Sequence, residues 1–158
     1  MSAKSDNVAE LEQAYRVFRA RIADLSEDAF AEEWLGMWNL SQLLTHMNGW
    51  FAEMIGALGR VGRGERPTPE GVSYADANAW NAKFTESTPP GRAALAVFDR
   101  QFKAYAEAAS ALDEGLFGKT DEGKLKIGSR LLDGAGIHHF AEHGAEIDAW
   151  LASRKAAN

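Results

Sequence analysis

The chain has 158 residues, 46% of them hydrophobic, which fits a single domain spanning residues 1–158 around one buried core. Its formal net charge of -6 argues against nucleic acid or an anionic membrane surface as the main partner. The absence of cysteine excludes disulfides, thiolate nucleophiles and cysteine-ligated zinc, so any metal must be held by nitrogen and oxygen.

Two long amphipathic segments occupy the first third of the chain. Apolar residues spaced three and four apart predict a helix over roughly residues 6–25. A second helix is expected from about residue 40 to residue 60, because Asn39 and Gln42 have the spacing of a capping box. The glycines and prolines of residues 59–69 end that helix, since neither residue type continues one readily.

Three further helices are expected in the remainder. A capping pattern at Ser73–Asp76 predicts a short helix to about residue 84, and a long helix follows from Pro89 to about residue 112. After a polar segment, Ser129 is the expected cap of a last helix that ends near Ser153. No alternating strand pattern competes, so the sequence predicts an all-α, antiparallel four-helix bundle with one short additional helix.

The sequence carries no sign of secretion or membrane insertion. Its first residues are polar, and no apolar run approaches the ~20 residues that span a bilayer. We therefore expect a cytoplasmic protein without a membrane partner. Bundles of this kind often pair through a helix face, so a homodimer is one candidate assembly, although the sequence does not decide the oligomeric state.

Two histidines on the last predicted helix form the main chemical signal. His139 and His143 are four residues apart on its apolar face, so both imidazoles can approach one point, as in helical metal sites. His138 points to the opposite side. Gly136 and Gly144 are expected to leave space beside the imidazoles. The alternative is that each histidine is a hydrogen-bonded core residue, although burying two unpaired imidazoles is costly.

A third histidine lies on the second predicted helix, in a less decisive position. His46 is roughly 100° from the centre of that helix's apolar face, beside Glu53 and Trp50. Glu53 is the candidate for a carboxylate that orients a metal-bound histidine. Trp50, Phe140 and Trp150 are core residues in the simplest interpretation, and the walls of a ligand pocket in the sharper one.

Three segments of the chain resemble the DinB/YfiT-like superfamily. Residues 38–50, WNLSQLLTHMNGW, are similar to its Trp, cap, Leu-Leu-x-His-x-x-x-Trp segment, and residues 76–83 are similar to its short middle segment centred on an asparagine. His139 to His143 resembles the His-x-x-x-His pattern of its last helix. The three segments occur in the family's order and span almost the whole chain.

This resemblance implies a DinB-like bundle that holds a divalent metal, usually nickel, zinc or iron. The ligands would be His46, His139 and His143, which match the family pattern without departure. Members that resemble maleylpyruvate isomerases use a low-molecular-weight thiol as a cosubstrate. The colibactin-resistance ClbS/DfsB group shares the bundle but not always the three histidines, so the fold alone does not imply a metal.

Three hypotheses for function follow. The first is a metal-dependent enzyme, a hydrolase or a thiol-dependent transferase or isomerase, acting on a small electrophilic molecule, because three imidazoles leave coordination positions open. The second is a non-catalytic or single-turnover protein that sequesters a small toxic metabolite. The third is a purely structural bundle. No general base is identified from the sequence beyond the suggestion of Glu53.

Overall fold

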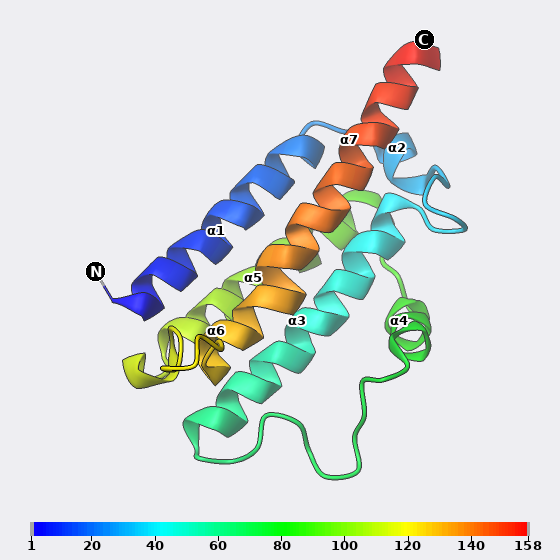
Figure 1. Cartoon of the computed structure of the whole chain (residues 1–158). Coiled ribbons are helices and arrows are strands. Elements are labelled where there is room, and N and C mark those ends of the chain that lie inside the picture. The colour runs from blue at the N-terminus through cyan, green and yellow to red at the C-terminus, as the bar shows by residue number, and fades with distance from the viewer. Residues whose placement is uncertain (1, 158) are drawn as a thin grey trace.

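Four long helices form a bundle in the computed structural model, which describes residues 2–157 (Figure 1). They are α1 (Ala3–Ile22), α3 (Leu40–Gly62), α5 (Gly91–Ser110) and α7 (His139–Ala157). The short helix α4 (Ala77–Thr85) lies beside α3. The predicted all-α four-helix bundle with a short additional helix is confirmed, and residues 2–157 contain no strand.

The direction of the helices follows from contacts near their ends. Lys4, at the start of α1, donates to the carbonyl oxygen of Ser110 at the end of α5. Arg21, near the end of α1, pairs with Asp148 of α7. The contact between Lys4 and Ser110 shows that the neighbours α1 and α5 are antiparallel. The long connection over residues 63–90 lets α3 and α5 run in the same direction (Figure 1).

Several element boundaries differ from the sequence expectation. A short helix α2 (Glu27–Ala31), capped by Ser26, interrupts what the sequence suggested was a plain connection. Helix α4 begins after Asp76, whose carboxylate accepts from the Ala79 N–H, whereas the Ser73 hydroxyl accepts from Ala75 in the preceding turn. The capping box of Asn39 and Gln42 is confirmed.

The last helical segment begins before Ser129. Helix α6 (Ile127–Leu132) already contains this serine, which is buried and does not act as a cap. Its hydroxyl accepts from the Gly118 N–H at 2.7 Å and donates to the amide oxygen of Asn7 on α1. Ser129 therefore ties three parts of the chain together.

An aromatic cluster forms the centre of the core. Phe140 of α7 is 1% exposed, and its ring centroid lies between 5.3 and 6.2 Å from five rings on α1, α3 and α5. These rings belong to Tyr15, Phe18, Phe51, Phe98 and Phe102. Tilted and edge-on pairs at such distances stabilise a core beyond the area they bury. Phe140 thus fixes the start of α7 against all three other long helices.

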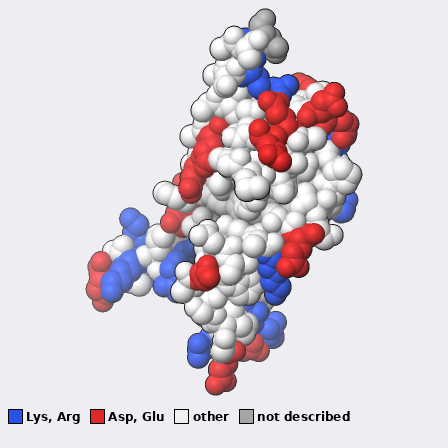
Figure 2. Space-filling view, turned by 90° about the vertical axis from the view of Figure 1, so that its right-hand side faces the viewer, with Lys and Arg blue, Asp and Glu red and all other residues white. Residues whose placement is uncertain are grey.

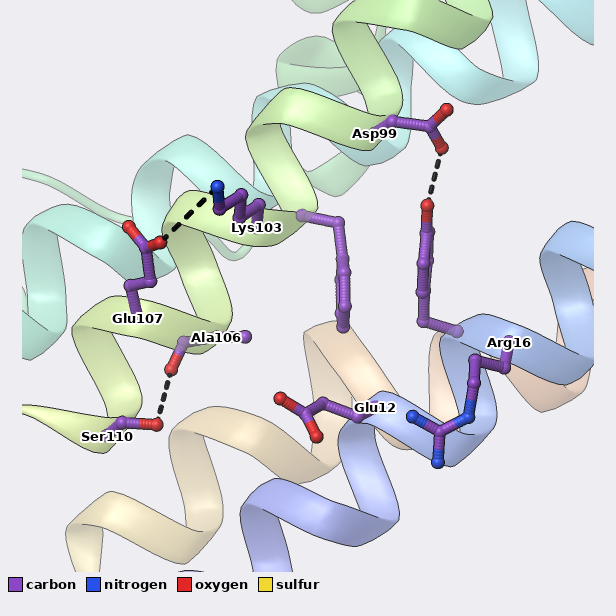
Figure 3. Close-up of a pocket in the computed structure, with 9 residues that line it drawn as sticks. Glu12, Arg16, Asp99, Lys103, Ala106, Glu107 and Ser110 are labelled. Carbon is purple, nitrogen blue, oxygen red and sulfur yellow. Dashed lines mark hydrogen bonds and ion pairs between the residues drawn. The ribbon is translucent and has the colours of Figure 1, made fainter.

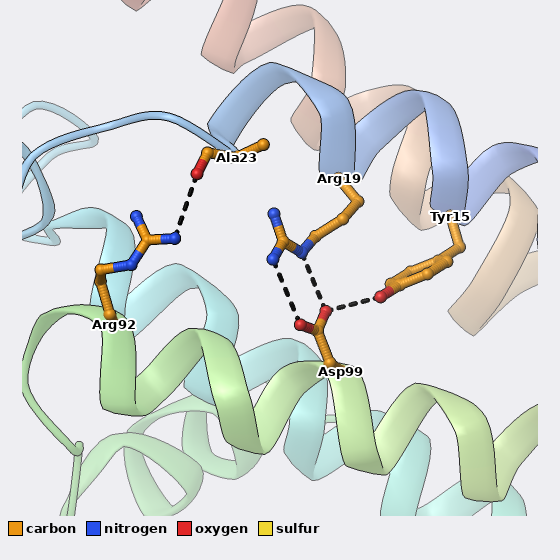
Figure 4. Close-up of polar contacts among 5 residues, drawn as sticks. All are labelled: Tyr15, Arg19, Ala23, Arg92 and Asp99. Atoms are coloured by element: carbon orange, nitrogen blue, oxygen red, sulfur yellow. Dashed lines mark hydrogen bonds and ion pairs between the residues drawn. The ribbon is translucent and has the colours of Figure 1, made fainter.

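A polar clamp joins α1 to α5 at the edge of this cluster (Figure 4). Asp99 accepts from the Tyr15 hydroxyl at 2.5 Å and from the Arg19 guanidinium at 2.9 Å. Burial, together with the bond to Asp99, raises the pKa of Tyr15 to about 12. At the start of α5, Arg92 donates to carbonyl oxygens just after α1, including that of Ala23.

Among the residues described, none of the helices combines the length and apolar character needed to cross a bilayer.

A π-helical turn, η2 (Asp133–His138), joins α6 to α7 immediately before His139. Gly136, in this turn, is buried against α1 and α5. A Cβ at Gly136 would lie 2.5 Å from Leu11 Cδ1 and 3.1 Å from the Tyr105 hydroxyl. Because Leu11 and Tyr105 are both 0% exposed, neither can swing aside, and only glycine fits here.

We expect Gly136→Ala to lower the free energy of unfolding by about 1–3 kcal/mol, because it overpacks a closed core. Gly134→Ala is the matched control in the same turn, since a Cβ there meets nothing within 4 Å. That variant should be neutral or gain up to about 1 kcal/mol. Urea unfolding followed by far-ultraviolet circular dichroism measures both, and equal losses would contradict the packing argument.

Candidate metal centre

Three histidines meet between α3 and α7. His46 comes from α3, and His139 and His143 come from the first two turns of α7. One ring nitrogen of each lies within 4.8 Å of the others, so the group could hold a metal ion. The Nε2 atoms of His46 and His139 are 3.1 Å apart. His46 is 3% exposed, so the site is closed on the α3 side.

The Nδ1 atom of each imidazole lies within hydrogen-bonding distance of an oxygen acceptor. His46 Nδ1 lies 2.6 Å from the Leu43 carbonyl oxygen, and His139 Nδ1 lies 3.2 Å from that of Ala135. His143 Nδ1 lies 3.1 Å from a carboxylate oxygen of Glu146. Because these oxygens only accept, each Nδ1 carries the proton and donates, which leaves each Nε2 with a lone pair.

Burial keeps the three imidazoles neutral. Desolvation is the largest cause that lowers the pKa of His46 to about 3 and that of His139 to about 4. It also lowers the pKa of His143. Repulsion from neighbouring imidazoles adds to the effect on His46 and His139. A neutral ring with a free Nε2 is the form of histidine that binds a metal.

The donor set fits a divalent transition metal. The Nε2 atoms of His46 and His139 lie 3.1 Å apart in a poorly solvated space, and one ring nitrogen of His143 lies within 4.8 Å of the ligand atoms of both, an arrangement that a bound cation stabilises. Neutral imidazole suits zinc, nickel and iron, whereas magnesium and calcium prefer oxygen. Fixed Nδ1–H donors are the arrangement that orients histidine ligands in known metal sites.

The π-helical turn supplies one of these fixed acceptors. Ala135, whose carbonyl oxygen holds His139, lies within η2, and the turn's Gly136 is locked against Leu11 and Tyr105. The Tyr105 hydroxyl also donates to the Leu131 carbonyl oxygen at 2.5 Å, just before the turn. Turns of this type occur frequently at functional sites. The core thus fixes the direction of His139.

A cavity of about 480 Å³ lies beside the triad, between α4 and the turn that precedes α3. We call it the α4 cavity. It is lined by seven residues from three segments: Leu35, Met37, Trp38, Asn78, Asn81, Ala82 and Glu146. Two of these contact the triad, because the Trp38 ring lies 4.8 Å from that of His46 and Glu146 holds His143.

A second hollow lies elsewhere. A groove of about 630 Å³ runs between α1 and α5, and none of the three histidines lines it (Figure 3). Charged side chains of both signs stand around its stacked Tyr15 and Phe102 rings, which are 4.0 Å apart. None of the three histidines lines the α4 cavity either, but two of its lining residues, Trp38 and Glu146, contact the triad, so the α4 cavity is the hollow connected to it.

The residues suggested as pocket walls lie in three different places. Trp50 donates through Nε1 to Asn81 at 2.8 Å and packs against the rings of Tyr74 and Phe84. Phe140 is the central core ring described above. Trp150 stacks on Trp34 with ring centroids 4.6 Å apart. None of the three lines the α4 cavity.

The structure also shows where the other residues singled out by the sequence lie. Glu53 accepts from the Tyr74 hydroxyl at 3.0 Å, and no hydrogen bond or ion pair joins it to an imidazole among the residues described. His138 is exposed, as expected. The glycines do not leave space beside the imidazoles: Gly136 faces Leu11 and Tyr105, and a Cβ at Gly144 would lie 2.8 Å from the Arg21 guanidinium. Both glycines instead allow close helix packing.

Glu146, Trp38 and Asn81 are the site residues that sequence reasoning missed. A signal existed for Glu146, because residues three apart on a helix are neighbours and Glu146 follows His143 at that spacing. No local pattern indicates that Asn81 faces Trp50, since the two lie on different helices. Burial of His46 was also hard to foresee. Its flank is covered by Trp38 and by α7, so nearly all of the first two turns of α3 is buried.

We expect Glu146→Ala to weaken zinc binding about 10–100-fold, because His143 loses the carboxylate that fixes its tautomer and orientation. Glu142→Ala removes the same charge from an exposed position one residue before His143 and should change affinity less than about twofold. Competition with a chromophoric chelator measures both. Equal effects would mean that Glu146 acts only through its charge.

Comparisons with known proteins show which folds the chain shares. No family model matches it, and no curated protein matches it in sequence. A protein from Streptococcus pneumoniae superimposes with a TM-score of 0.77 at 12% identity, over 96% of this chain and 91% of the other. The colibactin self-resistance protein ClbS, in complex with double-stranded DNA, also gives 0.77 at 12% identity, over 92% and 93%.

An enzyme shares the fold as well. The mycothiol-dependent maleylpyruvate isomerase superimposes with a TM-score of 0.68 at 15% identity, over 91% of this chain. The match spans only 60% of the isomerase.

One of these neighbours corrects a sequence expectation. The expected absence of a nucleic-acid partner is wrong as an exclusion, because ClbS, a protein of the same fold, has been crystallised with double-stranded DNA. Net charge was the basis of that expectation, yet contact with phosphates depends on local charge. Figure 2 shows Lys and Arg side chains on the lower part of this face beside Asp and Glu side chains, so the charge varies locally although the net charge is -6.

At these identities the likeness shows the fold alone. The bundle is the one found in ClbS and in the mycothiol-dependent isomerase, so the helical fold that the sequence resemblance implied is confirmed.

Proposed function

We propose that His46, His139 and His143 bind one divalent metal ion, zinc, nickel or iron, and that the protein is a metal-dependent enzyme acting on a small electrophilic molecule. One observation carries the proposal. Each imidazole is held through Nδ1 by an oxygen acceptor, the Nε2 atoms of His46 and His139 are 3.1 Å apart, and one ring nitrogen of each histidine lies within 4.8 Å of the others. A structural bundle has no need of such convergence, which is costly without a cation.

The residues around the triad suit a reaction on a small molecule. A metal with three protein ligands supplies Lewis acidity at its open positions. Glu146 keeps the His143 proton on Nδ1, and the Leu43 and Ala135 carbonyl groups do the same for the other two rings. The α4 cavity, at about 480 Å³, has room for a metabolite-sized ligand beside them.

The reaction is a hydrolysis or a thiol-dependent transfer or isomerisation. The mycothiol dependence of the isomerase that shares this fold supports the thiol alternative. Because this chain contains no cysteine, the thiol would enter as a low-molecular-weight cosubstrate.

A second function is favoured by the extent of the structural match. The chain spans 93% of the self-resistance protein ClbS but 60% of the isomerase. The alternative is therefore a binding or single-turnover protein that captures a reactive metabolite in the α4 cavity. Both functions use the same pocket and differ in whether product leaves.

We expect protein purified without a histidine tag and loaded with zinc to retain one zinc ion per chain after desalting. His143→Ala should lose it, with affinity reduced at least about 100-fold, because two imidazoles cannot complete the set. His138→Ala, an exposed neighbour, is the matched control. Mass spectrometry of the bound metal gives the stoichiometry, and thermal unfolding confirms that both variants fold. A zinc-free wild type, or equal loss in both variants, would sink the proposal.

The zinc-loaded protein also separates an enzyme from a binder. An enzyme should convert many equivalents of a maleylpyruvate-like or epoxide-like electrophile in the presence of an added thiol. A capture protein should stop after about one equivalent. The measurement is product formed per chain by liquid chromatography. His143→Ala should abolish turnover, and turnover that survives this change would place the chemistry elsewhere.

A further inference from the structure

Asn81 is held in one orientation at the wall of the α4 cavity. Its side-chain oxygen accepts from the Trp50 Nε1–H at 2.8 Å. An indole N–H only donates, so the oxygen must face Trp50 and the amide nitrogen must be on the other side of the group. Trp50 does not line the cavity, whereas Asn81 does. The NH₂ group, a donor, is therefore the polar part of Asn81 available to a ligand.

The support behind Asn81 is rigid. The ring of Trp50 packs against those of Tyr74, Trp80 and Phe84, with centroids 5.2 to 6.2 Å apart. Phe84 lies directly on the backbone of α3, because a Cβ at Gly49 would come 2.1 Å from its Cγ. Helix α4 is thus fixed to α3 by close packing. A donor on such an element keeps its direction when a ligand arrives.

The residues that line the cavity from the turn before α3 are apolar. A tight turn over residues 35–38, closed by the Trp38 N–H donating to the Leu35 carbonyl oxygen at 2.9 Å, presents Met37 and Trp38. Met37 is 83% exposed at the tip of this turn, where Gly36 has a φ of +62°. Such a wall offers a flat and polarizable surface to a planar group.

No lysine or arginine lines the cavity, and its polar side chains are Asn78, Asn81 and Glu146. A ligand in the cavity can therefore form a hydrogen bond to a fixed amide. It cannot pair with a cationic side chain there. The natural complement of an N–H donor is a carbonyl-type oxygen. Glu146 is already engaged with His143 and Asn78 is exposed, which leaves Asn81, anchored by Trp50, as the donor with a fixed direction that selects for such an oxygen.

We infer that the α4 cavity is the substrate pocket of the triad and that Asn81 is its specificity-determining donor. The substrate class is a small molecule with a carbonyl-type oxygen next to a planar apolar group. The oxygen accepts from the Asn81 amide, and the planar group lies against Trp38 and Met37. The assignment to a substrate rests on the proposed function, whereas binding at Asn81 does not require the metal.

The test uses N,N-dimethylbenzamide, which has a carbonyl oxygen and a planar ring but no N–H group. It is titrated into ¹⁵N-labelled protein, both metal-free and with one equivalent of zinc. The Asn81 side-chain amide signals and the Trp38 indole signal should move together with one dissociation constant. Binding that leaves the Asn81 signals unmoved would overturn the inference, and so would no binding.

Two substitutions separate the fixed donor from charge. Asn81→Asp keeps the acceptor for Trp50 and nearly the same shape but removes the NH₂ group, so affinity should fall at least about tenfold. Asn78→Asp adds the same charge to the same cavity and should change affinity less than about threefold. Retention of the Trp50 indole signal shows that Asn81→Asp is folded. Equal losses in both variants would refute the role of Asn81.

The outcomes also separate this inference from the proposed function. If the wild type binds zinc but not the amide, the inference fails and the metal proposal stands. If the wild type binds the amide at Asn81 but no zinc, the pocket stands and the metal-dependent function fails.

Discussion

The structure of the site depends on where three protons are held. The Leu43 carbonyl, the Ala135 carbonyl and the Glu146 carboxylate each accept from an Nδ1–H, and this choice of tautomer leaves the lone pair of each ring on Nε2. Two of these acceptors are backbone groups of helical turns, so the helices themselves set the geometry. Helix α3 and the turn η2 must therefore keep their relative positions for the site to exist.

That requirement explains features of the core that have no direct contact with the triad. Phe140 follows His139 in the chain and is packed among rings from α1, α3 and α5. Gly136 lets α1 and α5 approach the π-helical turn that holds His139. Buried neutral imidazoles are costly, and burial lowers the pKa of His46 and His139 far below the ordinary value. A tightly packed aromatic core offsets that cost and keeps the three imidazoles in fixed relative positions.

Sequence reasoning found the parts of this arrangement that are local. The spacing of His139 and His143 on one helix and the Asn39 capping box are short-range patterns, and the structure contains both features. His46 came from a resemblance, because its burial depends on Trp38 and α7, which lie far away in sequence or outside its helix. The π-helical turn shifts the helical register in a way no ideal wheel includes. Net charge is a global quantity, and it misled about a nucleic-acid partner because contact with phosphates depends on local charge.

The connection between α3 and α5 links the topology of the bundle to its chemistry. Helix α3 has 23 residues and spans roughly 34 Å, so a chain that starts α5 in the same direction must return along that length. It returns beside α3 and carries α4 with it, so that Asn78, Asn81 and Ala82 line one part of the α4 cavity. A short hairpin to an antiparallel neighbour would leave the cavity without this wall. The parallel order of α3 and α5 therefore gives the triad a pocket.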